Sequence, residues 1–257
     1  GKTVLTIAAL EELLPKTAGL IICLSSLKYQ WEEQIKKFTD NSKVIVIDGT
    51  PKERHAQYEE AIYTSKVTHI ILNYEQVVND WEMVEKLPRS FVVCDEATAI
   101  KSFRSKRSRQ VKKLDSGIKF ALTGTPIENG QPEELYSIMQ FVDSKVLGRF
   151  DIFDKTFIIR NHFGGVERYR NLPTLNNTIS KASVRKKQSD PDVAPYLPNT
   201  IFAEPLLVNL DRSTAKLYNI IADDLSKDLE LALDSFGSSF DLFSHYSGND
   251  EGPKNEL

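Results

Sequence analysis

The chain has 257 residues, of which 40% are hydrophobic and 27% charged, and its formal net charge is −3 at pH 7. This composition is typical of a globular protein of one or two domains, and it excludes collagen-like and wholly disordered chains. No apolar run approaches the roughly 20 residues of a membrane span, and the mildly negative charge by itself disfavours a nucleic-acid partner. Because Cys23 and Cys94 lie inside apolar runs, we expect buried thiols of a reducing, intracellular compartment, not a disulfide or metal site.

Short apolar runs rich in Ile and Val recur through the first half of the chain. They are residues 19–24, 43–47, 69–72, 91–94 and 119–122. Because these runs are nearly continuous in apolar residues, they predict strands that are buried on both faces. Segments with helical spacing alternate with them, at residues 27–38, 52–64, 75–86, 105–114 and 132–142. The alternation predicts an α/β fold for residues 1–145, with a mostly parallel sheet flanked by helices.

The pattern changes after about Val146. Residues 146–204 contain aromatic-rich helical patches interrupted by four prolines, which predicts an irregular, mainly helical extension. Residues 211–234 predict one amphipathic helix that opens at Asp211 and Ser213. The last 20 residues are rich in Ser, Gly and Asp, so they predict a flexible acidic tail.

The tripeptide Gly1-Lys2-Thr3 comes directly before a helical stretch. In a phosphate-binding loop, glycine lets the backbone approach phosphate oxygens, lysine supplies a cation, and a threonine hydroxyl binds Mg²⁺. The free N–H groups of a helix N-terminus add to the attraction for anions. The tripeptide therefore fits the second half of such a loop, although a tripeptide alone is weak evidence.

Two acids, Asp95 and Glu96, follow the apolar run 91–94. They are expected at the carboxyl end of a buried strand, where open α/β sheets bind their ligands. Asp95 would hold Mg²⁺, and Glu96 would orient or deprotonate an attacking water. The simpler interpretation is that the acids cap the next helix.

A third motif, Leu122-Thr123-Gly124-Thr125-Pro126, also follows a buried run. Two hydroxyls around a glycine can relay hydrogen bonds between a phosphate site and a moving neighbour, whereas the simpler interpretation is a Gly-Pro turn. The order of the three motifs favours the functional interpretation, because all three would meet at one edge of one sheet.

Together these motifs resemble motifs I, II and III of the superfamily-two helicase-like ATPases, and among them most closely the Swi/Snf family of DNA translocases. The string at residues 122–129 is close to that family's L-T-G-T-P-x-Q-N. The resemblance covers about residues 1–222 and extends to further segments: Ile22–Leu27 with Trp31, Glu33 and Phe38; Asn73-Tyr74-Glu75; Ile100-Lys101-Ser102; Glu134–Ser137, Phe141, Phe153 and Phe157; Val184–Lys187; Leu197-Pro198; and Leu217-Tyr218.

Three positions depart from the family pattern. Leu24 replaces the proline of the segment after the first run, Thr98 replaces the histidine of motif II, and Glu128 replaces the glutamine of motif III. In the family this histidine and glutamine are thought to couple the ATP state to lobe movement. Their replacement puts tight coupling in doubt but affects ATP binding less, because the phosphate and metal residues are kept.

The resemblance implies a RecA-like ATP-binding lobe over residues 1–145, a helical family-specific extension over 146–235 and an acidic tail or linker over 236–257. The first strand and the start of the P-loop are expected upstream of Gly1. ATP would lie between this lobe and a second RecA-like lobe of the same polypeptide that this chain lacks. Because that second lobe supplies the arginines that complete the site, the isolated lobe is expected to be weakly active or inactive.

The resemblance also implies a role for each motif residue. Gly1, Lys2 and Thr3 would bind the nucleotide, Thr3 and Asp95 would bind Mg²⁺, and Glu96 would act on the water, with Asp95 and Lys2 as its catalytic partners. The loop Thr123-Gly124-Thr125 would couple the site to movement.

The expected polymer is DNA, with the duplex favoured. Residues 101–113 carry seven basic residues and no acid, so a local cationic stretch exists despite the negative net charge. By resemblance, DNA contacts would come from strand-edge loops opposite the nucleotide and from this stretch: Ser25, Ser26, Leu27, Asn73, Tyr74, Lys101 and Arg104. Such backbone contacts carry no sequence information. Trp31, on an amphipathic segment, is expected in the core and not as a base-stacking platform.

Two alternatives stay open. The first is a strand-separating DNA or RNA helicase of the same superfamily, which the string at residues 122–129 disfavours. The second is a degenerate lobe that binds nucleic acid without turnover; Thr98 and Glu128 favour it, whereas intact Lys2 and Glu96 oppose it.

Overall fold

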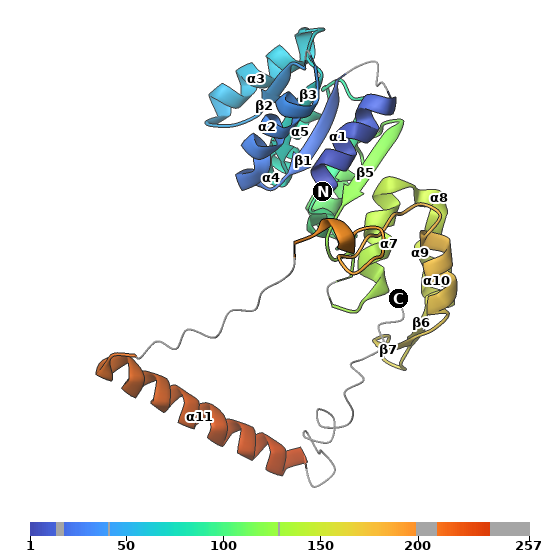
Figure 1. Cartoon of the computed structure of the whole chain (residues 1–257). Helices are drawn as coiled ribbons and strands as arrows, with labels where there is room; N and C mark the ends of the chain where they lie inside the picture. The colour runs from blue at the N-terminus through green and yellow to red at the C-terminus, as the bar shows by residue number, and fades with distance from the viewer. Residues whose placement is uncertain (14–17, 41, 128, 199–209, 237–257) are drawn as a thin grey trace. The chain divides into compact units, whose positions relative to one another are not determined.

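The centre of the first unit, residues 1–183, is a sheet of five parallel strands in the order β2-β3-β1-β4-β5. The computed structural model describes residues 1–13, 18–40, 42–127, 129–198 and 210–236 (Figure 1). Along the sheet, the strands are β2 (Val44–Val46), β3 (His69–Asn73), β1 (Gly19–Cys23), β4 (Phe91–Asp95) and β5 (Ile118–Leu122). Every pair of neighbours runs parallel, which confirms the predicted α/β class and the five predicted strands.

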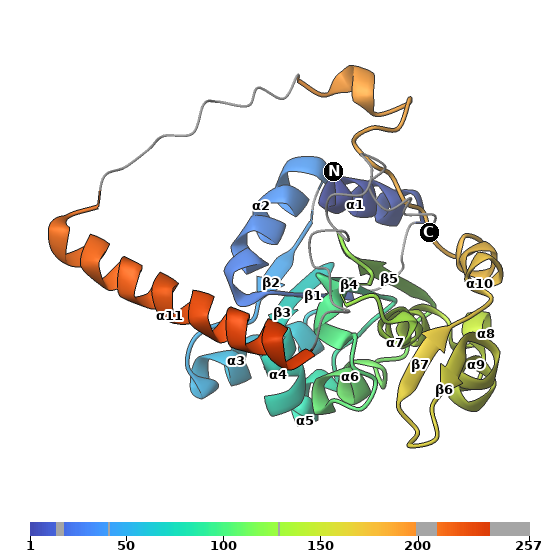
Figure 2. The same cartoon turned by 90° about the horizontal axis from the view of Figure 1, so that it is seen from below.

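Helices cover both faces of this sheet. One face carries α1 (Lys2–Leu13) and α2 (Lys28–Phe38). The other face carries α3 (Pro51–Tyr63), α4 (Tyr74–Asn79), α5 (Trp81–Val84), α6 (Lys106–Val111) and α7 (Pro132–Val142). Figure 2 shows the two groups on opposite sides of the strands.

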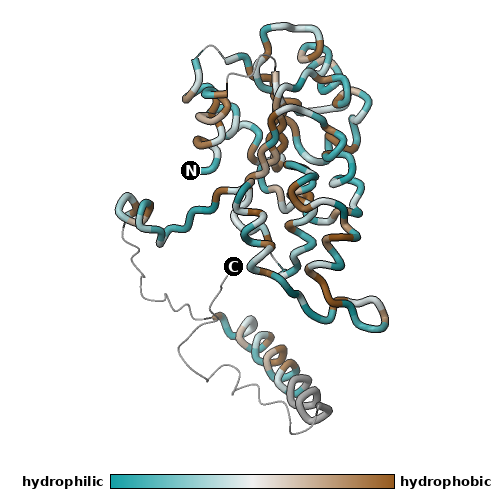
Figure 3. Tube along the Cα trace, turned by 90° about the vertical axis from the view of Figure 1, so that its right-hand side faces the viewer, coloured by the Kyte–Doolittle hydropathy of each residue, from teal (hydrophilic) through white to brown (hydrophobic). Residues whose placement is uncertain are grey.

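Alternate residues of each central strand enter two different cores. Ile21 of β1 packs against α1 and α2, while Leu20 and Ile22 pack on the opposite side. All five residues of β1 and of β4 are buried. The continuous apolar runs in the sequence therefore correctly predicted strands that are covered by helices on both faces. In Figure 3 the hydrophobic colour is concentrated in the centre of this unit, where the sheet lies.

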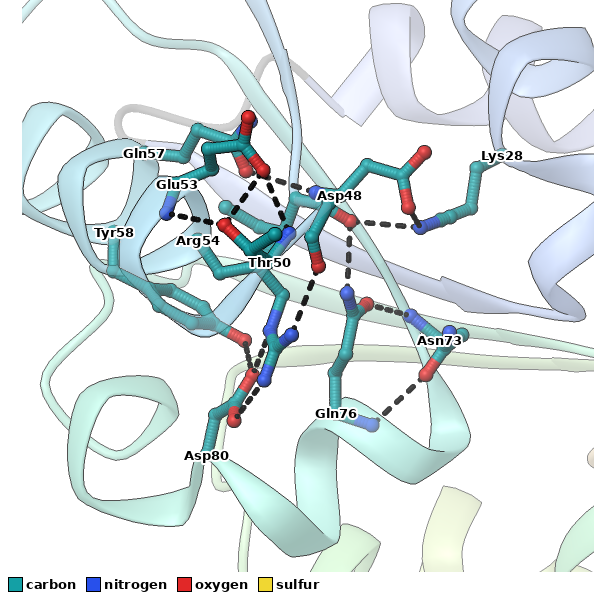
Figure 4. A network of polar contacts seen from close by, with 12 residues as sticks. Lys28, Asp48, Thr50, Glu53, Arg54, Gln57, Tyr58, Asn73, Gln76 and Asp80 are labelled. Carbon is teal, nitrogen blue, oxygen red and sulfur yellow. Dashed lines mark hydrogen bonds and ion pairs between the residues drawn. The ribbon is translucent and has the colours of Figure 1, made fainter.

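The predicted helix 75–86 is two helices, α4 and α5, which meet at Asp80. The Asp80 carboxylate accepts hydrogen bonds from Arg54 Nε at 2.7 Å and Nη2 at 2.9 Å, and from the Tyr58 hydroxyl at 3.0 Å (Figure 4). These bonds join α3 to the junction between the two short helices. Short 3₁₀ turns are also present at η1 (Ser25–Leu27), η2 (Ala97–Ile100) and, in the second unit, η3 (Ala194–Tyr196).

The first unit continues past the boundary expected at residue 145. Its later elements are α8 (Ser144–Leu147), α9 (Phe150–Phe157), β6 (Ile158–Arg160), β7 (Val166–Tyr169) and α10 (Leu172–Ile179). They enclose a small core in which Phe153, Phe157 and Leu175 pack against Tyr136 of α7. Because α7 contributes Tyr136 to this core and Ile138 and Phe141 to the sheet core, residues up to 183 form one compact unit with the sheet.

The antiparallel hairpin of β6 and β7 was not expected from the sequence, which indicated helical patches there. Its strands are short, and three of the four residues of β7 are exposed, so β7 shows no apolar run; in β6 only Ile158 and Ile159 are apolar. The hairpin turn is held by Asn161, whose N–H donates to the Gly165 carbonyl at 2.8 Å, and by Gly164 with a φ of 81°.

The second unit, which begins at Val184, contains η3 and the long helix α11 (Arg212–Phe236). This helix confirms the amphipathic helix predicted at 211–234. Asp211 caps it, because its Oδ1 atom accepts hydrogen bonds from the N–H groups of Ser213 and Thr214, both at 3.0 Å. Hydrogen bonds from the Ser213 and Thr214 hydroxyls, together with these backbone bonds, lower the pKa of Asp211. The predicted acidic tail lies outside the described residues.

His69 at the start of β3 makes folding sensitive to mild acid. The side chain is 6% exposed and its ring lies 5.6 Å from the ring of Phe91, and burial lowers its pKa from 6.5 to about 4. Between these values the unfolded chain binds a proton that the folded chain does not, so stability falls as the pH drops from 6.5 towards 4. We expect a loss of about 2–3 kcal/mol across this range. Urea unfolding at pH 7, 6 and 5 measures the first part of this loss.

The matched control for His69 is His55, whose side chain is 59% exposed on α3. His69→Gln should flatten the dependence between pH 6.5 and 5, where carboxylates contribute little, and His55→Gln should leave it unchanged. An unaltered slope in His69→Gln would contradict the prediction.

Candidate active site

The predicted motifs meet at one edge of the sheet. Because all five strands are parallel, the residues that follow β1, β3, β4 and β5 emerge at the same carboxyl edge. The register places Asp95 beside Leu122, so the acids of motif II adjoin the loop that begins at Thr123. In the same way, Cys23 pairs with Asn73, so segment 24–27 adjoins the β3–α4 junction.

Helix α1 begins at Lys2, as expected for a helix that follows a phosphate-binding loop. Its first intrahelical bond runs from Leu5 N–H to the Gly1 carbonyl at 3.0 Å. The N–H groups of the first turn therefore remain available to an anion. A Cβ atom built on Gly124 would lie 3.9 Å from Lys2 Nζ, so the lysine of motif I reaches the glycine of motif III.

Asp95 is held in a defined orientation at the end of β4. The residue is 7% exposed, and its Oδ2 atom accepts a hydrogen bond from Trp31 Nε1 at 2.8 Å. Its Oδ1 atom accepts from the N–H of Glu96 at 3.0 Å, and its carbonyl accepts from the Tyr74 hydroxyl at 2.7 Å. The carboxylate oxygens have about four lone-pair sites in all, so acceptor capacity remains for a cation.

Glu96 has a strained backbone. Its φ of 47° and ψ of 59° lie in the left-handed region, which costs a residue other than glycine about 1–3 kcal/mol. Its side chain makes no capping hydrogen bond to η2, which follows it, so the helix-cap interpretation finds no support here. A strained, half-exposed carboxylate beside a buried one is typical of a site where the backbone is shaped for function.

The motif III loop is exposed at its tip and anchored at its far end. Thr125 N–H donates to Thr123 Oγ1 at 3.1 Å across the exposed Gly124. Further along, Asn129 Nδ2 donates to Glu134 at 2.7 Å, and Lys101 Nζ lies 3.5 Å from the same Glu134 Oε1 atom. The buried Glu134 thus ties this loop to the segment after motif II. The predicted departure at Glu128 lies outside the described residues.

Five of the candidate nucleic-acid residues lie at or after the ends of β1 and β3, and Lys101 and Arg104 come after β4, so all of them belong to the same carboxyl edge as the ATP candidates. Ser25 and Ser26 are exposed and Leu27 is half-buried. Asn73 caps α4, since its Oδ1 accepts from Gln76 N–H at 2.8 Å. Arg104 is exposed, with its guanidinium 5.2 Å from the centre of the Phe103 ring.

Tyr74 corrects the sequence prediction of a nucleic-acid contact. Its side chain is 1% exposed and its hydroxyl donates to the Asp95 carbonyl, so the ring is part of the core beneath the site. Burial is the main cause of the raised pKa of this hydroxyl, which therefore stays protonated as a donor. Arg107 is half-buried beside it: its guanidinium lies 5.9 Å from the centre of the Tyr74 ring and pairs with Glu75.

The sequence did not reveal that Trp31 and Lys28 position the site. The buried indole of Trp31 confirms the expected core position, but no sequence pattern indicated its bond to Asp95, because the partners are 64 positions apart. Lys28 is 1% exposed, and its Nζ donates to the Ile47 carbonyl at 2.8 Å and to Asp48 Oδ1 at 2.7 Å. Gln76 Nε2 donates to the same Ile47 carbonyl at 3.0 Å, which joins the loops after β1, β2 and β3 (Figure 4).

Neither a protein-only metal cluster nor a reactive thiol is present in the described part of the chain. It contains no group of three or more His, Cys, Asp or Glu side chains placed to hold a metal ion, and no helix in it is long and apolar enough to cross a membrane. Cys23 and Cys94 are free and buried, as expected. Burial raises the pKa of Cys23 to about 12 and raises that of Cys94 as well, so neither thiol is a nucleophile at neutral pH.

Comparison with known proteins adds to this geometry. The chain is 28% identical over 237 residues to an uncharacterized ATP-dependent helicase of Mycoplasma genitalium, a match that covers 90% of this chain and 21% of the relative. It is 24% identical over 269 residues to the chromatin-remodeling ATPase INO80 of Vanderwaltozyma polyspora, covering 98% of this chain and 16% of that protein. The chain thus spans about a fifth or less of the length of these relatives.

A solved structure, the Sulfolobus solfataricus SWI2/SNF2 ATPase core in complex with dsDNA, superposes with a TM-score of 0.61 at 28% identity. The match covers 76% of this chain and 39% of that one. A family model described as the SNF2-related domain matches residues 1–241. The chain therefore belongs to the SNF2-related domain family of helicase-like ATPases.

Proposed function

We propose that this chain is the N-terminal motor lobe of an ATP-dependent DNA translocase, which couples hydrolysis of Mg-ATP to movement along duplex DNA. The observation that carries the proposal is the approach of Lys2 to Gly124, at the edge where Asp95 and Glu96 leave the neighbouring strand. This arrangement supports one site assembled from three motifs that are separated by up to about 120 positions in the chain.

The nucleotide site combines a cation, a helix N-terminus and oxygen ligands. Gly1 and Lys2 bind the phosphates with the N–H groups of α1, and Thr3 and Asp95 bind Mg²⁺. A hydroxyl and a carboxylate are hard oxygen donors, which fits a cation that takes few protein ligands and keeps waters and phosphate oxygens. A Mg²⁺ ion held there would supply positive charge to the phosphates, and Glu96 would orient and deprotonate the attacking water.

The DNA track consists of the loops after β1 and β3 and the basic segment 101–113. Ser25, Ser26, Leu27 and Asn73 offer short side chains and backbone groups, and Arg104 offers an exposed cation. These groups suit phosphate contacts, which carry no sequence information. The related Sulfolobus solfataricus core was solved with double-stranded DNA, which supports a duplex as the polymer. Lys101 forms an ion pair with the buried Glu134, so we expect it to contribute less to DNA binding than Arg104 does.

A second RecA-like lobe of the same polypeptide completes this motor. The small coverage of the relatives' own length supports this part of the proposal. In it, residues 1–145 are the ATP-binding lobe and 146–235 are the family-specific extension. The lobe by itself hydrolyses ATP weakly, because an arginine supplied from outside is worth about 10³–10⁵-fold in phosphoryl transfer. The motor acts inside the cell.

The test is ATP turnover of the full-length protein with duplex DNA, single-stranded DNA and RNA in parallel, with Glu96→Gln as the control for contaminating activity. We expect the largest stimulation with duplex DNA. Stimulation by RNA alone would indicate a helicase of another class. Absence of Glu96-dependent turnover on every polymer would indicate a binding lobe without catalysis, as the threonine at position 98 would allow.

A further inference from the structure

Trp31 connects helix α2 to the ATP-site carboxylate. Its side chain is 2% exposed, and its Nε1 atom lies 2.8 Å from Asp95 Oδ2. A hydrogen bond from a neutral donor to a buried carboxylate is short, directional and strengthened by the charge. Core packing alone would require only an apolar ring at this position, so the bond to Asp95 adds a function that packing does not explain.

The other bonds of Asp95 leave the indole as the side-chain donor from another part of the chain. Asp95 Oδ1 accepts from the adjacent Glu96 N–H, and the Tyr74 hydroxyl binds the main-chain carbonyl and not the carboxylate. Rotation of the carboxylate about its Cα–Cβ bond is therefore opposed mainly by Trp31. A group that orients a metal-binding carboxylate in this way tunes its affinity for the ion.

The helix that carries Trp31 also carries the candidate nucleic-acid segment at its start. Residues Ser25–Leu27 form η1, and α2 follows without a break at Lys28. The buried Lys28 fixes the first turn of α2 to Ile47 and Asp48 (Figure 4), and Trp31 lies about one turn further on. Trp31 is therefore separated from η1 by less than one and a half turns of anchored helix.

We propose that Trp31 is a positioning residue that orients the Asp95 carboxylate for Mg²⁺, and that through α2 it links this carboxylate to the nucleic-acid segment Ser25–Leu27. The inference rests on the proposed function, because it takes Asp95 as a metal ligand. It adds a route between the two ends of the site that does not use the motif III loop.

The first test is Mg²⁺-dependent nucleotide binding by Trp31→Phe in the full-length protein. Phenylalanine keeps an aromatic ring in the core but lacks the N–H. We expect the half-saturating Mg²⁺ concentration to rise about 10-fold, with nucleotide affinity measured in EDTA unchanged. The matched control is Trp81→Phe, since Trp81 is the other tryptophan of the chain and lies half-buried on α5.

Unchanged Mg²⁺ dependence in Trp31→Phe would overturn this inference alone. If the unmutated protein shows no Mg²⁺-dependent nucleotide binding, the proposed function fails and the inference fails with it. The two failures are thus distinguished by the protein in which they occur.

A second measurement keeps Trp31 in place, in case Trp31→Phe does not fold. In the Trp81→Phe protein a single indole N–H remains, and ¹⁵N-labelled tryptophan reports it by NMR. We expect Asp95→Ala to shift this resonance and to speed its exchange with solvent, and we expect duplex DNA to shift it when Asp95 is present. An indole resonance that responds to neither change contradicts the proposed link.

Discussion

Replacing Glu96 with glutamine is expected to lower ATP turnover by the full-length protein about 10²–10⁴-fold, while nucleotide binding stays within a few-fold of the unmutated protein. Glutamine matches the size of glutamate but cannot accept a proton from water. Steady-state phosphate release measures the rate, and titration with a fluorescent ATP analogue measures the binding.

The left-handed backbone of Glu96 makes this substitution a clean one. Both residues bear the same cost at a φ of 47°, and the Glu96 side chain makes no capping bond that glutamine would disturb. The melting temperature should therefore not change. Glu59→Gln, at an exposed position on α3, is the matched control and should leave turnover unaltered. If the Glu96→Gln protein retains more than a tenth of the ATP turnover rate, Glu96 does not activate the attacking water.

The parallel sheet could be predicted because continuous apolar runs have one common explanation, burial on both faces. The runs at 19–24 and 91–94 are the clearest cases, since every residue of β1 and β4 is buried. The edge at which the motifs meet could be predicted for the same reason, because parallel strands present all their carboxyl ends together.

What periodicity could not supply is the identity of long-range polar partners. The spacing of α2 placed Trp31 on the apolar face, but nothing local specified a carboxylate 64 positions away. Lys28 reads as a solvent-exposed residue, although the structure buries it almost completely. Tyr74 gave the same error from another source, since a family motif suggested an exposed contact and the ring lies in the core.

The hairpin of β6 and β7 escaped prediction for a different reason. Its strands of three and four residues are too short to show a period of two. Most of the buried residues of this small core, such as Phe153, Leu175 and Tyr136, come from helices, and β6 adds Ile158. The apolar spacing in this region therefore predicted the helices but not the two strands between them.

The second large effect is expected at the ion pair of Lys28 and Asp48. The Lys28 side chain is 1% exposed, whereas that of Asp48 is 41% exposed. Asp48→Ala removes the counter-charge and leaves a buried ammonium with the Ile47 carbonyl as its remaining partner, so the free energy of unfolding should fall by about 3 kcal/mol. Urea unfolding at pH 7 measures it. Glu60→Ala, which breaks the exposed pair with Lys43, should change stability by less than about 1 kcal/mol.

The pH dependence of the same pair has a defined sign. Hydrogen bonds from Lys28 and Tyr29 lower the pKa of Asp48 to about 2. A carboxyl group whose pKa is depressed by folding stabilises the fold above its unfolded pKa of 3.8, and this contribution is lost as the pH falls towards 2. The stability difference between the unmutated protein and Asp48→Ala should therefore narrow below about pH 4.

The cost of Asp48→Ala has its origin in an orphaned charge, so removing that charge should restore stability. Lys28→Met keeps the length of the side chain and its contacts but places no ammonium in the core. The Ile47 carbonyl keeps a partner, because Gln76 Nε2 still donates to it at 3.0 Å. The double variant Lys28→Met with Asp48→Ala should thus be more stable than Asp48→Ala alone. If the double variant instead loses as much free energy of unfolding as the two single variants together, the unpaired ammonium carries no penalty. The buried ion pair would then not be what holds the first turn of α2.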